Sequence, residues 1–169
     1  LGYILDEINV PVYAPSLTAD LIKVMMEHYN KRNRTHIELK LHPVSREADI
    51  KIKGVNVSFF PLTHSIPGSI GVAFETSQGY IVYTGESIID FGAPDGFKST
   101  LQRMMDIGNK GVLALLVESS YATRDGYTSP KHKLTNKIEP IFEDTNGRII
   151  ISAYAQNIFR IQEIIKLKK

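Results

Sequence analysis

A continuous apolar run, Val112-Leu113-Ala114-Leu115-Leu116-Val117, constrains the fold of this chain most strongly. Six apolar residues without alternation predict a strand buried on both faces, as in sheets that are covered by helices. A helical pattern at 100–107 precedes the run. Alternating or β-rich segments predict further strands upstream, at 36–41, 48–53, 55–60, 69–76 and 80–84, with a hairpin turn at 77–79. We therefore expect an α/β (α+β) fold.

The two ends of the chain add helices and short strands to this sheet-forming centre. Helical spacing of apolar residues predicts a helix that ends near residue 9 and another over 16–30, with a strand at 10–14 between them. After residue 131 the pattern predicts a helix at 134–143, a strand at 148–153 and a helix at 155–168. This order is typical of the start of an α/β unit.

Composition excludes several classes of protein. The chain has no Cys, which rules out disulfide scaffolds, zinc–thiolate sites and thiol nucleophiles. A bound metal would need His, carboxylate or carbonyl ligands. No apolar run reaches the roughly 18 residues that cross a membrane, so we expect no membrane segment. The missing Cys fits a cytoplasmic protein, which is the location we expect. The 169 residues begin at Leu1 in what reads as the middle of an element, and we expect a piece of a longer protein.

Two residues at predicted strand ends are candidates for metal binding or catalysis. His64 follows a strand in a loop rich in Ser, Pro and Gly, beside the hydroxyl of Ser65, although such a His can also simply bond a backbone carbonyl. Glu86 follows the next hairpin strand after Gly85, and it could equally be an exposed turn carboxylate. The hairpin between them predicts that both side chains meet at one rim of the sheet. Histidine plus carboxylate suits a divalent cation, although a zinc site needs three or four ligands.

A third candidate, Glu118, lies at the carboxyl end of the apolar run, where open α/β sheets place ligands. A capping role is the alternative. The segment after residue 131 is rich in Lys and Arg, including Arg160. These residues could contact phosphates, or they could form the solvated face of two amphipathic helices.

At these residues the sequence resembles the RNase J group of metallo-β-lactamase-fold ribonucleases, within the β-CASP nucleases. Residues 64–67 read His-Ser-Ile-Pro and residues 81–85 read Ile-Val-Tyr-Thr-Gly, which are similar to two ordered motifs of that family. Residues 1–13, the Gly-Tyr-Thr at 126–128 and residues 151–162 resemble further family segments. The resemblance spans nearly the whole chain in the family's order.

The resemblance implies an αββα sandwich, with residues 1–125 forming a partial metallo-β-lactamase-like domain and residues 126–169 starting a β-CASP insert. It also implies two metal ions, usually zinc, that activate water to attack an RNA phosphodiester. His64 matches the family's third metal motif, and Ser65 would support it. Glu86 lies where the family has a metal-bridging Asp, and Glu118 matches the acidic residue that ends the buried strand.

Two departures from the family pattern affect the expected activity. The principal metal motif, His-x-His-x-Asp-His, is absent, and we expect it upstream in the full protein, so the chain alone should be inactive. The Asp-to-Glu change at Glu86 moves the carboxylate oxygens by about 1.5 Å.

Three hypotheses follow. The first is an RNase J-type hydrolase that cleaves RNA in processing and decay. The second is a catalytically weak RNase J-like subunit that binds RNA and pairs with an active paralogue. The third is a small-molecule hydrolase of the lactamase fold. The helix–strand–helix segment predicted after residue 131 argues against this third hypothesis. For the first two we expect RNA as the partner, and a homo-oligomer or a hetero-oligomer with an RNase J paralogue.

Overall fold

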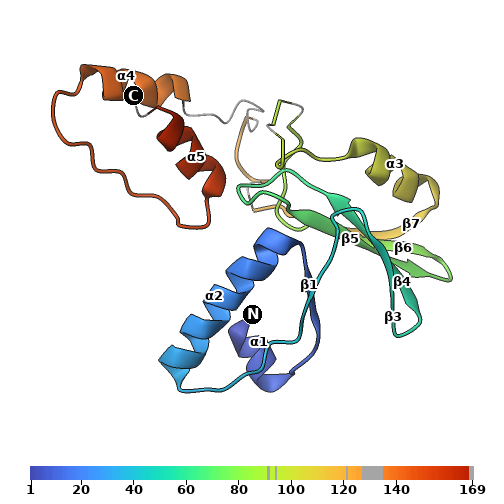
Figure 1. Ribbon diagram of the computed structural model, residues 1–169. Coiled ribbons are helices and arrows are strands. Elements are labelled where there is room, and N and C mark those ends of the chain that lie inside the picture. The colour runs from blue at the N-terminus through green and yellow to red at the C-terminus, as the bar shows by residue number, and fades with distance from the viewer. Residues whose placement is uncertain (91, 94, 121, 127–134, 168–169) are drawn as a thin grey trace.

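The computed structural model describes residues 1–90, 92–93, 95–120, 122–126 and 135–167. Figure 1 labels the helices and strands along the chain. They are α1 (Gly2–Glu7), β1 (Val12–Ala14), α2 (Ser16–Asn33), β2 (Leu41–Pro43), β3 (Asp49–Ile52), β4 (Val55–Pro61), β5 (Ile70–Thr76), β6 (Gly79–Tyr83), α3 (Leu101–Asn109), β7 (Val112–Leu116), α4 (Thr135–Asp144) and α5 (Ile158–Lys166). The expected mixed α/β class is confirmed.

The larger of the two described sheets has five strands in the order β3-β4-β5-β6-β7. Strands β3 to β6 are an antiparallel meander, and β7 pairs with β6 in parallel. Helix α3 makes this parallel crossover and packs on the sheet through Ile107 and Met104. The core between them consists of Phe60, Leu62, Ala73, Tyr80, Val82 and Ile107. The alternation seen in the sequence therefore places one face of β4, β5 and β6 against α3.

Two smaller groups of elements flank this sheet (Figure 1). Strands β1 and β2 pair in parallel beside α1 and α2, where Tyr3 meets the ring of Tyr29 edge-on. Helices α4 and α5 contact each other, and the Thr135 hydroxyl donates to Glu163 Oε1 at 3.0 Å. Within the described part of the chain, no helix combines the length and apolar character needed to cross a bilayer.

The prediction that the apolar run 112–117 is buried on both faces is wrong. The run does form β7, but every one of its residues is exposed. Strand β7 is the last in the sheet order and has β6 as its neighbour. The apolar sequence thus predicts the strand correctly, but its burial depends on packing partners that the described residues do not supply.

Other expectations are wrong in their extent. Residues 148–153 form no strand, and Ile150 is 88% exposed, because no neighbouring described segment completes hydrogen bonds with this stretch. The strand expected at 36–41 is wrong for residues 36–40, and β2 begins at Leu41. The helix expected at 155–168 begins at Ile158. Residues 127 and 128 of the Gly-Tyr-Thr loop lie outside the described residues, so the boundary between 125 and 126 stays a prediction.

Candidate functional site

Three strand ends converge at one edge of the sheet. Strands β4 and β6 both run antiparallel to β5 and therefore finish at the same edge, and β7 finishes there because it is parallel to β6. The backbone N–H of Thr84 donates to Leu116 O at 3.1 Å, which joins the exits of β6 and β7. Just beyond β6, Gly85 has a φ of +59°, a conformation that glycine adopts without strain and that turns the chain toward the site.

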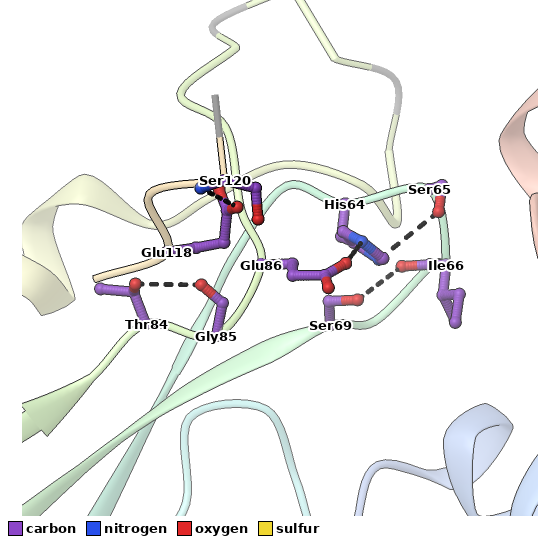
Figure 2. Close-up of polar contacts among 9 residues, drawn as sticks. All are labelled: His64, Ser65, Ile66, Ser69, Thr84, Gly85, Glu86, Glu118 and Ser120. Atoms are coloured by element: carbon purple, nitrogen blue, oxygen red, sulfur yellow. Dashed lines mark hydrogen bonds and ion pairs between the residues drawn. The ribbon is translucent and has the colours of Figure 1, made fainter. Parts of the chain in front are cut away.

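His64 and Glu86 are in direct contact at this edge, as Figure 2 shows. His64 Nε2 lies 3.3 Å from Glu86 Oε2. The His64 side chain is 28% exposed and that of Glu86 is 77% exposed. The imidazole is therefore partly buried, and the carboxylate is largely exposed to solvent. An isolated antiparallel bridge between Thr63 and Ile88 holds the two segments together next to the pair. The structure thus brings together two side chains that the sequence places at separate strand ends.

The separation of the pair fits two neighbouring ligand positions on one metal ion. Two ligand atoms bound at about 2.1 Å to a tetrahedral zinc ion lie about 3.4 Å apart. The observed 3.3 Å between His64 Nε2 and Glu86 Oε2 matches this spacing. Among the described residues, however, no group of three or more His, Asp or Glu side chains gathers into a metal site. The pair can therefore supply two ligands, and a full coordination sphere needs further donors.

Glu118 lies near the pair but is turned away from it (Figure 2). Its Oε1 accepts the backbone N–H of Ser120 at 2.6 Å. Hydrogen bonds from the Ser120 hydroxyl and N–H hold the pKa of the Glu118 carboxyl below its usual range. Glu118 is therefore a fixed negative charge beside the His64–Glu86 pair, and the structure does not bring it into the pair itself.

Ser65 lies on the opposite side of the imidazole. Its Oγ is 3.5 Å from His64 Nδ1, at the outer limit of a hydrogen bond. The backbone of Ser65 makes a better contact, since its carbonyl accepts the N–H of Phe159 at 3.1 Å. The loop that carries His64 is therefore attached to the start of α5.

A cavity of about 610 Å³ joins these residues. His64, Ser65, Glu86 and Glu118 line one side, and Asn157, Phe159 and Arg160 at the start of α5 line another.

Sequence reasoning missed the wall formed by α5, because it counted Arg160 only as one of many basic residues. One available signal was Asn157, whose Oδ1 accepts the N–H of Arg160 at 3.0 Å and caps α5. Phe159 anchors the wall by an edge-to-face contact with Phe97 at 5.1 Å.

Comparison with known proteins shows which proteins the chain is similar to. No family model matches the chain. Ribonuclease J 2 of Staphylococcus epidermidis is 38% identical over 167 residues, which is 99% of this chain. Ribonuclease J 2 of Staphylococcus saprophyticus is 38% identical over 165 residues, and that of Staphylococcus aureus is 36% identical over 167. The chain is homologous to a segment of RNase J.

The similarity to ribonuclease J 2 implies the expected metallo-β-lactamase and β-CASP fold for this chain. The chain spans 29% of the length of these RNase J relatives. A crystal structure of a protein of unknown function from Enterococcus faecalis V583 matches 93% of this chain and 39% of its own, with a TM-score of 0.62 and 17% identity. That likeness concerns the fold alone. The roles of His64, Glu86, Glu118 and Ser65 stay predictions.

Proposed function

We propose that the protein containing this chain is a metal-dependent ribonuclease of RNase J type that hydrolyses RNA phosphodiester bonds. The observation that carries the proposal is the 3.3 Å separation of His64 Nε2 and Glu86 Oε2 at the rim of the cavity. Homology to ribonuclease J 2 over 99% of the chain supports it. In this proposal His64 binds zinc through Nε2 and Glu86 binds it through its carboxylate.

Bound zinc would supply a hydroxide nucleophile at neutral pH and offset charge on the phosphate. The charges of the residues that line the cavity support a requirement for bound metal. Glu86 and Glu118 are carboxylates that repel an RNA phosphate, and the pKa of Glu118 is held below its usual range. On the far wall Arg160 is cationic, but Glu163 lies 3.0 Å from its guanidinium. RNA would therefore approach this cavity readily only when cations are bound there.

A second candidate function is a catalytically weak subunit that binds RNA and works with an active RNase J paralogue. Two observations favour it. Among the described residues only two donors meet at the site, and Glu86 carries one methylene more than the aspartate of the family pattern. A longer side chain that bridges two metal ions disturbs the distance between the ions, which is roughly 3.5–4 Å.

The test is hydrolysis of a 5′-labelled single-stranded RNA by the full-length protein with added zinc. Wild type, His64→Ala and a control, His28→Ala, are compared; His28 is exposed on α2. We expect cleavage by wild type and by His28→Ala, and a loss of about 100-fold or more in His64→Ala, because even second-shell partners of a metal are worth 10–100-fold.

A Glu86→Asp variant separates the two candidates. If wild type is inert and Glu86→Asp cleaves RNA, the weak-subunit function is supported and the defect lies at this residue. If wild type binds RNA but cleaves it only when an active paralogue is added, the second candidate is supported as well. Inert wild type and inert Glu86→Asp, neither of which binds RNA, would overturn both candidates. Equal cleavage by wild type and His64→Ala would overturn the assignment of the site.

A further inference from the structure

A buried hydrogen-bonded contact lies directly behind His64. Thr63, the preceding residue, is 2% exposed. Its backbone N–H donates to Ser99 Oγ at 2.9 Å, and its own Oγ1 lies 3.1 Å from the same atom. One serine hydroxyl therefore satisfies both polar groups on this side of Thr63, which have no access to water.

Thr63 is held on its other side by the segment that carries Glu86. The carbonyl of Thr63 accepts the N–H of Ile88 at 3.1 Å, two residues after Glu86. Thr63 thus lies between Ser99 and the Glu86 segment, directly before His64 in the chain.

The segment around Ser99 follows the His64 loop along its length. Thr100 N–H donates to Pro61 O at 3.3 Å before the loop, and Gly96 O accepts the N–H of Gly68 at 2.8 Å after it. Ser99 contributes the side-chain contact between these two backbone bonds. Of these three contacts, the one made by the Ser99 hydroxyl is therefore the contact that a substitution can remove without altering the backbone.

We propose that Ser99 is a positioning residue, which sets the separation of His64 and Glu86 for metal binding by fixing Thr63. The proposal rests on the proposed function. A buried N–H that loses its partner is costly, so the loop rearranges to find another one. A rearrangement of about 1 Å at the pair is enough to lower activity about 100-fold. The hydrogen bonds of the Ser99 hydroxyl go to Thr63, and among the described residues none joins Ser99 to His64 or Glu86.

The experiment compares Ser99→Ala, Ser99→Thr and Ser58→Ala in the full-length protein. Ser99→Thr keeps the hydroxyl. Ser58→Ala is the control, because Ser58 is a serine whose hydroxyl donates to Asp49 at 2.5 Å, at the β3–β4 side of the sheet and away from Thr63. The readouts are zinc affinity by competition with a chelator, kcat and KM for the labelled RNA, and the denaturant midpoint.

We expect Ser99→Ala to bind zinc about 10–100-fold more weakly and to lose kcat, with KM for RNA unchanged, and Ser99→Thr to restore zinc affinity. Ser58→Ala should lower the denaturant midpoint and bind zinc as wild type does. If wild type binds zinc and cleaves RNA but Ser99→Ala binds zinc equally well, the positioning role is wrong and the proposed function stands. If wild type neither binds zinc nor cleaves RNA, both are overturned.

Discussion

Replacing Gly71 by alanine should destabilise the sheet just where β4 leads into the His64 loop. Gly71 pairs directly with Phe60 across β4 and β5, and the Phe60 ring lies over it. A Cβ at position 71 would lie 2.3 Å from Phe60 Cζ, 2.4 Å from Phe60 Cε2 and 3.0 Å from Leu62 Cδ1. Carbon atoms in contact are ordinarily about 3.5–4.0 Å apart, so the ring must move by more than about 1 Å.

The ring has no room for that movement. Phe60 is 1% exposed and packs in the core between the sheet and α3. Overpacking of a closed core costs about 1–3 kcal/mol, which for a domain of this size lowers Tm by about 2–4 °C per kcal/mol.

A matched control makes the same Gly-to-Ala substitution but is expected to raise the free energy of unfolding rather than lower it. Gly108 lies inside α3 and has nothing within 4 Å of its added Cβ. Alanine is favoured over glycine in a helix by about 0.5–1 kcal/mol, so Gly108→Ala should be stabilising. Urea unfolding followed by circular dichroism measures both variants. A Gly71→Ala protein as stable as wild type would refute the reasoning, because Phe60 could not then cover Gly71 as described.

Two further predictions concern the edge of the sheet and the α5 wall. Burial raises the pKa of Asp49, but hydrogen bonds from Ser58 and from the guanidinium of Arg103 outweigh it and leave the pKa below its usual value. The ionised carboxylate therefore stabilises the fold above about pH 4. The stability lost in Asp49→Asn should shrink as the pH falls through the pKa of the folded protein, and pH-independent loss in urea titrations would contradict this. Phe159→Ala should remove the ring contact with Phe97 and speed amide exchange over 158–166, whereas unchanged exchange would show that α5 is held by other contacts.

Strands β3 to β7 and the meeting of His64 with Glu86 could be predicted from the sequence for a physical reason. Alternation of apolar and polar side chains indicates a strand with one buried face. Short hairpins determine which strand ends lie at the same edge of the sheet. The connection at 62–69 makes β5 antiparallel to β4, and the turn at 77–79 makes β6 antiparallel to β5, so β4 and β6 end on the same side of the sheet. Local pattern and chain connectivity are sufficient at these positions.

Features that depend on contacts between distant segments could not be predicted in this way. The apolar run of β7 indicates a strand, but its exposure depends on what packs against it. Ser99 gives no signal in the sequence, because its role arises only when it meets Thr63 in the folded chain. The cavity wall at Phe159 likewise depends on a hydrogen bond to Ser65, far away in the sequence.

The zinc content of the full-length protein, measured after dialysis for wild type, His64→Ala and His28→Ala, tests the central claim most directly. If His64 and Glu86 supply ligands, wild type and His28→Ala retain zinc, and His64→Ala loses at least one ion per chain. Equal zinc content in wild type and His64→Ala, or a wild type that holds no zinc, would contradict the claim that this pair binds metal.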